Sequence, residues 1–410
     1  MSWVTRGNLT VRQIRRAGGG GVGGAMSEQP TGTVDGSDGP DAPAMTLSTR
    51  DPEELRRTLT AWLADQLHDG AGPEVAELGS NSANGMSSET VLFTATWTDP
   101  AGTEVSEELV ARIAPDVANE PVFPEYALHH QFEAIRQVAE VTDVPVPPVR
   151  WIESDPAVIG SPFFVMTRVD GVVPPDVMPY TFGDNWLYDA SPEQQRRLQD
   201  TSIGVLAGLH SIEGGADRFG FLASTSPGDT PLRRHVAHTH EWYEFARDRA
   251  MRSSLVEDGF AWLEANWPGT EGDAVLSWGD SRIGNMMYRD FEPVAVLDWE
   301  MAGIGPRELD LGWMVFSHMV FEQLAQNFEL GGMPDFLRAD DAAATYEALT
   351  GVTPHDLEWF TVYAAVQWGI VFMRTGTRQV HFGEIEAPDT PDALMHHSPL
   401  LTRLLEEVGA

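Results

Sequence analysis

The sequence contains no cysteine and no lysine, and each absence excludes several kinds of chemistry. Without cysteine there is no disulfide, thiolate nucleophile, iron–sulfur cluster or cysteine-bound zinc. Without lysine there is no Schiff-base chemistry and no Walker A phosphate loop, which requires Gly-Lys-Ser/Thr. The sequence also has no run of 18 or more apolar residues, so it predicts no membrane-spanning helix.

Positive charge is scarce, because 26 arginines oppose 62 acidic residues and give a formal net charge of −36 over 410 residues. Nucleic acids and anionic membranes are bound through clustered positive charge, so we expect neither as the main partner. A cationic small molecule would be attracted, although solubility is the simpler explanation of the charge. The 42% apolar content, with 13 Trp and 18 Phe, is enough for hydrophobic cores.

The first 48 residues differ in composition from the rest of the chain. Four arginines precede a glycine-rich run over 18–24, and a Ser/Gly/Pro/Asp-rich stretch follows. The apolar core of a secretory signal is missing. We expect residues 1–48 to be a disordered leader, with Met26 or Met45 as an alternative start, and we expect a cytoplasmic protein.

The apolar pattern changes period along the chain and predicts two lobes. Alternation of apolar residues with threonine over 91–98 predicts a half-buried strand. The other predicted elements before residue 170 are strands near 75–78, 109–113, 149–152 and 163–168 and helices over 49–67 and 124–141. After a proline-rich stretch at 171–175, the period becomes helical, with helices near 191–210, 232–250, 253–266, 308–328, 340–349 and 355–375. We therefore predict an α+β protein with a sheet lobe over 49–170, a helical lobe over 171–410 and a cleft between them.

Polar clusters follow two short predicted strands between residues 275 and 300. The first strand leads into Gly-Asp280, with Asn285 five positions later, and the second ends at Asp298. Carboxylate and amide oxygens are the ligands that Mg²⁺ prefers. The spacing is that of kinase sites, in which the first aspartate accepts the proton of the substrate hydroxyl. The asparagine and the later aspartate hold Mg²⁺ against the ATP phosphates.

Several segments resemble the aminoglycoside phosphotransferase (phosphotransferase enzyme) family, which has a protein-kinase-like fold. They are LVARIAP, FPEYALHHQFEAI, DVPVP, FFVMTRVDG, GVLAGLHSI, WGDSRIGN and AVLDWEMAGIGPRELDLGW, in family order. The chain is most similar to mycobacterial proteins described as aminoglycoside phosphotransferases and to the kinase-like domains of some acyl-CoA dehydrogenases. The resemblance implies a small antiparallel-sheet N-lobe with one main helix and a larger, mostly helical C-lobe. It also implies transfer of the γ-phosphoryl group of ATP to a hydroxyl of a small molecule.

The resemblance assigns a role to each residue of the polar cluster. Asp280 corresponds to the catalytic base, and Asn285 and Asp298 correspond to the ligands of Mg²⁺. Asp310 corresponds to an aspartate that braces the catalytic loop from the start of a helix. Glu300 is expected either to support the site or to contact substrate.

The resemblance also assigns residues to nucleotide binding. Arg112 stands where the family has the phosphate-contacting basic residue of the third strand, and Glu125 stands where the next helix supplies its ion-pair partner. Residues 84–88 resemble the loop that covers the phosphates, and residues 166–169 resemble the hinge that reads adenine through its backbone. The expected cofactor-binding residues are thus Arg112, Glu125, Asn84, Gly85, Ser87, Met166 and Arg168.

Two positions depart from the family pattern. Trp278 replaces the histidine that usually precedes Gly-Asp, and we expect altered bracing of the loop with retained chemistry. Arg112 replaces a lysine, and an arginine keeps the charge and can grip two phosphate oxygens.

Two other functions fit the sequence less well. The Trp278 substitution is compatible with a nucleotide-binding regulator or pseudokinase that has lost turnover. A metal-dependent hydrolase would combine Asp280 and Asp298 with the histidines of His235-x-x-His238-x-His240. On a helix His240 points away from His238, so we interpret these histidines as a surface cluster.

Overall fold

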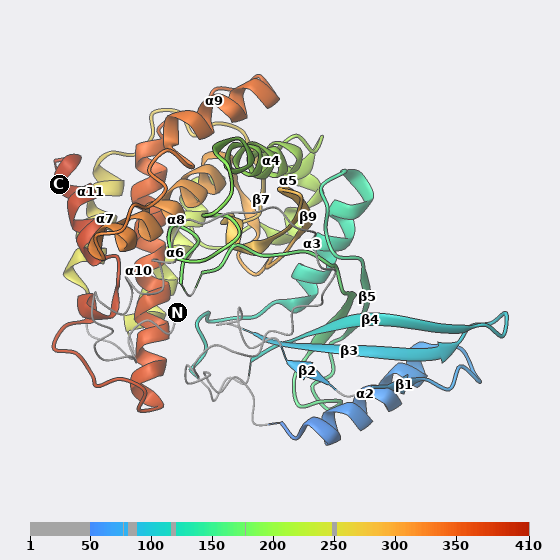
Figure 1. Cartoon of the computed structure of the whole chain (residues 1–410). Coiled ribbons are helices and arrows are strands. Elements are labelled where there is room, and N and C mark those ends of the chain that lie inside the picture. Colours follow the sequence, from blue (N-terminus) through green and yellow to red (C-terminus); the bar gives the residue numbers. More distant parts are fainter. Residues whose placement is uncertain are drawn as a thin grey trace, which may run out of the picture.

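The structure is a computed structural model that describes residues 50–76, 78–80, 88–115, 120–176, 178–247 and 252–409. The leader expected over residues 1–48 lies outside this part of the chain. The described residues form two lobes, a smaller one built on a sheet and a larger one built mainly of helices (Figure 1). The α+β class and the two-lobe plan predicted from the sequence are therefore confirmed.

The smaller lobe contains a six-stranded antiparallel sheet. Its strands lie in the order β1-β3-β4-β6-β5, and β2 pairs with β3. The strands are β1 (Glu74–Val75), β2 (Gly79–Ser80), β3 (Glu89–Thr98), β4 (Glu104–Ile113), β5 (Val149–Glu153) and β6 (Phe163–Thr167). The alternation over 91–98 lies in β3, as predicted.

One face of the sheet packs against helix α2 (Pro52–Gln66), and the two together enclose the core of the smaller lobe. Phe93 and Trp97 of β3 are buried in this core. The helix begins where the sequence predicts, because the Asp51 side chain accepts a hydrogen bond of 2.9 Å from the amide of Glu54.

The opposite face of the sheet looks toward the larger lobe. Antiparallel register places Thr90 opposite Arg112 and Val110 opposite Met166. All four residues line a cavity between the lobes. The alternation of side chains along a strand thus gives β4 one buried apolar face and one face that carries Arg112.

Helix α3 (Leu128–Val141) begins later than the predicted residue 124. The carbonyls of residues 121 and 122 accept hydrogen bonds from the Arg374 guanidinium and the Trp242 indole of the larger lobe, at 2.6 and 3.0 Å. These contacts tie residues 121 and 122 to the larger lobe, and the chain bends over 122–124 before the helix begins. Glu125 therefore precedes the helix.

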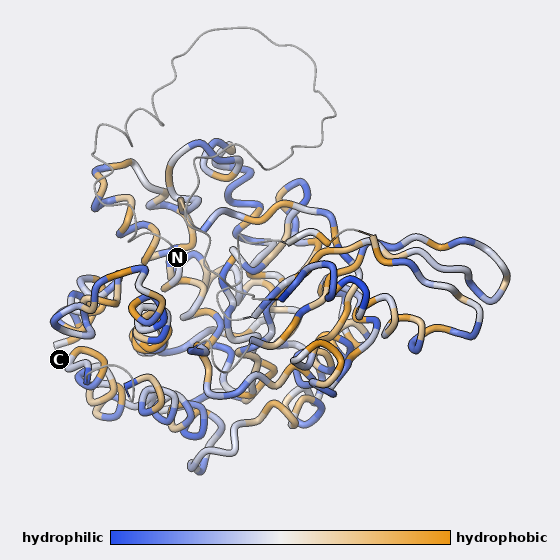
Figure 2. Tube along the Cα trace, turned by 90° about the horizontal axis from the view of Figure 1, so that it is seen from below, coloured by the Kyte–Doolittle hydropathy of each residue, from blue (hydrophilic) through white to orange (hydrophobic). Residues whose placement is uncertain are grey.

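The larger lobe is organised around two buried helices, α8 and α10, which pack against each other. Hydrophobic and hydrophilic stretches alternate along its helices (Figure 2). Its helices are α4 (Pro192–His210), α5 (Gly215–Arg218), α6 (Pro231–Arg247), α7 (Ser254–Ala265), α8 (Glu308–Asn327), α9 (Ala339–Thr350), α10 (Leu357–His381) and α11 (Ser398–Glu407), with short 3₁₀ turns η2 (Gly220–Leu222), η3 (Ile283–Asn285) and η4 (Pro391–Leu394). Most were predicted, but α10 continues past the predicted residue 375 and α11 was not foreseen.

Two small antiparallel sheets carry the polar loops toward the smaller lobe. Strand β7 (Ala274–Ser277) pairs with β10 (Gly303–Pro306), and β8 (Met286–Arg289) pairs with β9 (Glu292–Val296). The turns after β7 and β9 contain the predicted catalytic segment. Among the helices that the structure describes, none is long and apolar enough to cross a bilayer.

Candidate active site

Asp310, in the first turn of α8, fixes the loop that follows β7. This fully buried carboxylate accepts hydrogen bonds through Oδ1 from the Gly279 amide at 2.8 Å and the Ser277 hydroxyl at 2.9 Å. Its Oδ2 accepts from the Trp278 amide at 2.9 Å and lies 2.9 Å from Nε2 of His210. A buried carboxylate with this many partners rigidifies its surroundings. The bracing role predicted for Asp310 is therefore confirmed.

Trp278 and Gly279 shape the same loop. The Trp278 indole is fully buried and donates a hydrogen bond of 2.9 Å to the carbonyl of Leu297, at the end of the neighbouring strand. Gly279 has φ +90°, and a Cβ atom there would lie 2.1 Å from the Met301 carbonyl oxygen, so only glycine fits. Tryptophan in place of the family histidine thus still ties the loop to the strand beside it.

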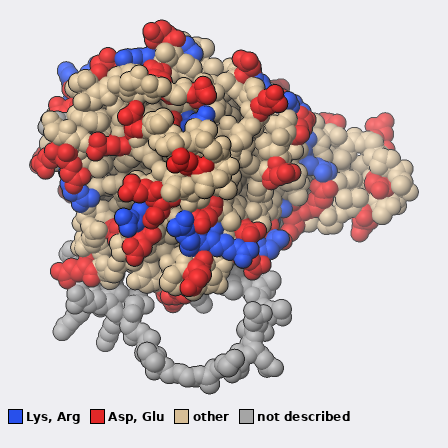
Figure 3. All heavy atoms as spheres, turned by 90° about the horizontal axis from the view of Figure 1, so that it is seen from above, with Lys and Arg blue, Asp and Glu red and all other residues tan. Residues whose placement is uncertain are grey.

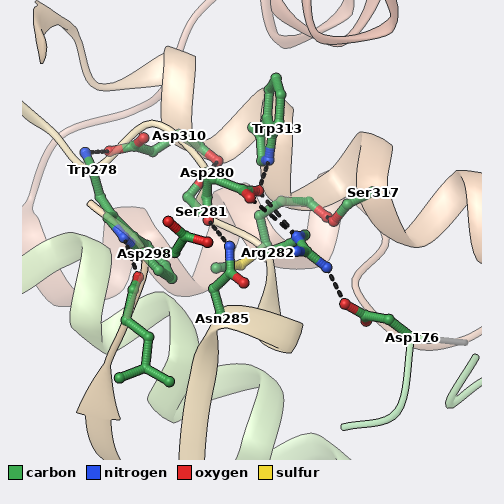
Figure 4. Close-up of polar contacts among 12 residues, drawn as sticks. Asp176, Trp278, Asp280, Ser281, Arg282, Asn285, Asp298, Asp310, Trp313 and Ser317 are labelled. Carbon is green, nitrogen blue, oxygen red and sulfur yellow. Dashed lines mark hydrogen bonds and ion pairs between the residues drawn. The ribbon is translucent and has the colours of Figure 1, made fainter. Parts of the chain in front are cut away.

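Asp280 lies at the tip of this loop, within a network of polar side chains (Figure 4). Its Oδ1 accepts a hydrogen bond of 2.7 Å from the Trp313 indole, and both oxygens accept from Nε of Arg282 at 3.1 and 3.2 Å. Arg282 also forms an ion pair with Asp176, from the segment that joins the lobes. The Asp280 carboxylate is therefore held in one orientation from two sides.

Asn285 and Asp298 lie beside Asp280 (Figure 4), and both line the cavity between the lobes. The Asn285 amide nitrogen donates to the Asp280 carbonyl at 3.1 Å, which leaves its amide oxygen for another partner. The backbone amide of Leu297 donates to the Asn285 carbonyl at 2.8 Å, so the two segments are adjacent. Asp298 has a left-handed backbone with φ +58°, a conformation that aspartate tolerates better than most residues. The predicted convergence of the carboxylate, the amide and the second carboxylate is present.

Burial and the neighbouring charges together set the pKa of the Asp298 carboxyl. Burial raises the pKa of its carboxyl, Arg112 lowers it, and the nearby Asp280 raises it again. The result is a pKa above the ordinary value, because a buried negative charge is disfavoured unless it is well neutralised.

Arg112 points from β4 toward the segment after β9. Its Nη2 lies 2.7 Å from Asp298 Oδ1 and 3.5 Å from Glu300 Oε2. Glu125, the predicted partner of Arg112, is exposed and lies ahead of α3. Arg112 therefore pairs with Asp298 and Glu300 in place of the predicted Glu125, because Glu125 lies in the irregular segment before α3 with its side chain exposed.

A cavity of about 390 Å³ lies between the lobes. Its walls come from the sheet, from α3 and from the turns after β7 and β9. Met166 and Arg168 line it, as does the rest of the 166–169 segment. The Arg168 amide donates to the Glu108 carbonyl at 2.9 Å, and its guanidinium pairs with the Glu108 carboxylate at 3.1 Å. Asn84, Gly85 and Ser87, predicted to cover the phosphates, lie outside the described residues.

Sequence reasoning missed three residues near Asp280, namely Asp176, Arg282 and Trp313. Arg282 lies inside the quoted motif, and Trp313 lies one helical turn after Asp310, so both had a detectable signal. Asp176 follows the proline-rich stretch, where no periodic pattern marks it.

The histidines near residue 238 do not form a metal site in the described part of the chain. His235 is engaged with the Tyr363 hydroxyl at 2.7 Å. Across the described ranges, no group of three or more His, Cys, Asp or Glu side chains is arranged to hold a metal ion. The hydrolase alternative therefore has no geometric support from these histidines.

Solved structures with a similar fold include proteins described as phosphotransferases. A protein from Ralstonia eutropha JMP134 described as a putative aminoglycoside phosphotransferase is 20% identical, with a TM-score of 0.61 over 86% of this chain and 97% of that chain. A macrolide 2′-phosphotransferase of type I is 15% identical, with a TM-score of 0.52 over 83% and 99% of the two chains. At these identities the likeness establishes the fold, which is the kinase-like two-lobe fold.

The family follows from the sequence. Residues 83–347, well over half of the chain, match the Phosphotransferase enzyme family. The chain belongs to this family, as the motifs predicted.

The curated relatives are larger proteins. The probable acyl-CoA dehydrogenase IBR3 of Arabidopsis thaliana is 26% identical over 51% of this chain and 26% of its own length. Human acyl-CoA dehydrogenase family member 11 is 29% identical over 41% of this chain and 20% of its own length. The chain thus spans about a quarter or less of these relatives, and the predicted likeness to proteins named acyl-CoA dehydrogenases is confirmed.

Proposed function

We propose that this protein is an ATP-dependent phosphotransferase that moves the γ-phosphoryl group to a hydroxyl of a small molecule. The observation that carries the proposal is that Arg112, Asn285 and Asp298 line one cavity between the lobes, with Asp280 next to Asn285 and Asp298. Such a site catalyses mainly by positioning and by neutralising charge. Family membership supports a phosphotransferase.

Asp280 is the proposed base. As the acceptor oxygen forms its bond to phosphorus and the bond to the ADP oxygen breaks, the hydroxyl proton passes to the Asp280 carboxylate. Trp313 and Arg282 hold that carboxylate in place, so little reorganisation precedes proton transfer. Arg282 also offsets negative charge beside the base.

Asn285 and Asp298 are the proposed holders of Mg²⁺. Their fit follows from the donor set: two oxygen ligands face one cavity, and Mg²⁺ takes its remaining ligands from phosphates and water. Burial raises the pKa of the Asp298 carboxyl, and a bound cation would favour its charged form. When bound, the metal would neutralise charge on the phosphates of ATP.

The other nucleotide contacts are proposed from the resemblance and the cavity lining. Arg112 would contact phosphate, and the backbone of residues 166–169, with Met166 and Arg168, would border the adenine. Because the Arg168 amide already binds Glu108, adenine would be read by neighbouring backbone groups. Residues 84–88 would cover the phosphates, while exposed Glu125 has no proposed role.

The acceptor is proposed to be a small molecule with a free hydroxyl. Acidic side chains are dispersed over the face shown in Figure 3, and over the whole sequence 62 acidic residues oppose 26 basic ones, so a cationic acceptor would be drawn to the protein. Dependence on ATP favours action in the cytoplasm.

The decisive experiment is an ATP-consumption screen with Mg²⁺ over hydroxyl-bearing acceptors, with Asp280→Ala as the blank. Removal of a positioned general base should lower turnover by roughly 10²–10⁴-fold. Equal turnover in the variant would end the assignment. Protection by MgATP against unfolding, without product from any acceptor, would instead favour the nucleotide-binding regulator suggested by Trp278.

A further inference from the structure

Both acidic partners of Arg112 come from the larger lobe, although Arg112 itself lies in the smaller one. Asp298 and Glu300 contact its guanidinium at 2.7 and 3.5 Å. All three side chains are mostly buried, with exposed fractions of 13% for Asp298, 9% for Glu300 and 12% for Arg112. Trp299 lies between the two acids, is buried, and donates to the Val296 carbonyl at 3.1 Å. The two carboxylates are therefore fixed on either side of an anchored residue.

Helix α3 supplies no carboxylate to Arg112. Its two acids, Glu133 and Glu140, pair with Arg136 on the outer face of the helix. The α3 side chains that are buried at the cavity are Gln131 and Ile135, both neutral groups. Arg112 thus depends for its neutralisation on the segment after β9.

A guanidinium that contacts two carboxylates can lose one of the two contacts and keep the other. On the proposed function, Mg²⁺ takes Asp298, which is the nearer partner of Arg112. A buried arginine left without an anion would be strongly disfavoured, and it would turn toward any remaining carboxylate. Glu300 is two residues away on the same anchored turn and already within 3.5 Å.

We propose that Glu300 is a positioning residue that holds Arg112 in the phosphate-facing orientation while Mg²⁺ occupies Asp298. This inference rests on the proposed function. It assigns to the larger lobe the task that the resemblance gave to a glutamate beside α3. Nucleotide grip by the smaller lobe then depends on its contact with the segment after β9.

The test is calorimetric binding of ADP, with and without Mg²⁺, to wild type, Glu300→Gln, Arg112→Gln and the double variant. Glu300→Gln should weaken MgADP binding roughly tenfold, and metal-free ADP binding less, because Asp298 then still holds Arg112. In the Arg112→Gln variant, the further change Glu300→Gln should weaken MgADP binding by less than about twofold. Glu133→Gln, which removes an acid from the outer face of α3, is the matched control and should bind MgADP as wild type does.

The outcomes separate the two proposals. If wild type does not bind MgADP, the proposed function fails. If wild type binds but the losses of the two single variants multiply in the double variant, Glu300 acts independently of Arg112, as a metal ligand would, and the inference is overturned. Circular dichroism checks the fold of each variant. If Glu300→Gln does not fold, Glu300→Asp takes its place, because it keeps the charge on a shorter side chain. Its loss of MgADP affinity must then also disappear when Arg112 is replaced.

Discussion

The two polar segments of the site are held in different ways. The loop after β7 is fixed within the larger lobe by hydrogen bonds to the fully buried Asp310. The segment after β9 is hydrogen-bonded within the larger lobe as well, but its Asp298 side chain is held by an ion pair that crosses between the lobes, to Arg112. The partners of Asp310 all belong to the larger lobe and stay in place. Asp298, by contrast, can give up its contact with Arg112 when a cation binds. The proposed base is thus preorganised, and the proposed metal site can exchange Arg112 for a cation.

Loss of Asp310 should have the largest effect on folding. Asp310→Ala leaves two backbone amides and a hydroxyl buried without an acceptor, and it strips His210 of its carboxylate. We expect stability to fall on the order of 3–5 kcal/mol, measured by urea unfolding. Asp340→Ala, in the exposed first turn of α9, should change stability by less than about 0.5 kcal/mol. Similar losses in both variants would contradict the bracing role.

Acid should weaken the scaffold of the first segment through His318, on the same helix as Asp310. Burial lowers the pKa of His318 to about 4, below the value of about 6.5 for an unfolded histidine. The contribution of neutral His318 to the free energy of unfolding is therefore complete above pH about 6.5. It is lost as the pH falls toward 4, by up to about 3 kcal/mol.

The measurement is urea unfolding of wild type and His318→Gln between pH 7 and pH 4.5. The variant should show a flatter decline than wild type over that range, since glutamine does not titrate. His355→Gln, at an exposed position, should keep the slope of the wild type. Parallel curves for wild type and His318→Gln would rule out this source of acid sensitivity.

The sequence was most informative where local pattern decides structure. Alternation located β3, and the capping aspartate located α2. The strand-end spacing located Asn285 and Asp298, which line the cavity, and Asp280 beside them. These features depend on neighbours in the chain, which is why they can be read without a structure.

Features set by distant parts of the chain were not predictable in this way. The segment before helix α3 is tied to the larger lobe by Arg374 and Trp242, which bind its carbonyls, and those donors lie more than a hundred residues away. Asp176 reaches Arg282 only through the fold. Glu125 was assigned by resemblance, yet the helix it was expected to join begins after it.

Asp298→Asn should have the smallest effect on folding. It therefore tests most finely the difference between the loop after β7 and the segment after β9. The substitution removes a buried carboxylate whose pKa is raised by burial, while Glu300 remains beside Arg112. We expect stability to change by no more than about 1 kcal/mol, but Mg²⁺ should no longer strengthen ADP binding. Asp290→Asn is the control, because Asp290 shares the left-handed backbone, with φ 52°, at an exposed position outside the site. Urea unfolding and calorimetry on both variants would show whether the segment after β9 serves the ligand more than the fold. A loss of stability as large as that of Asp310→Ala would show that both segments are structural braces.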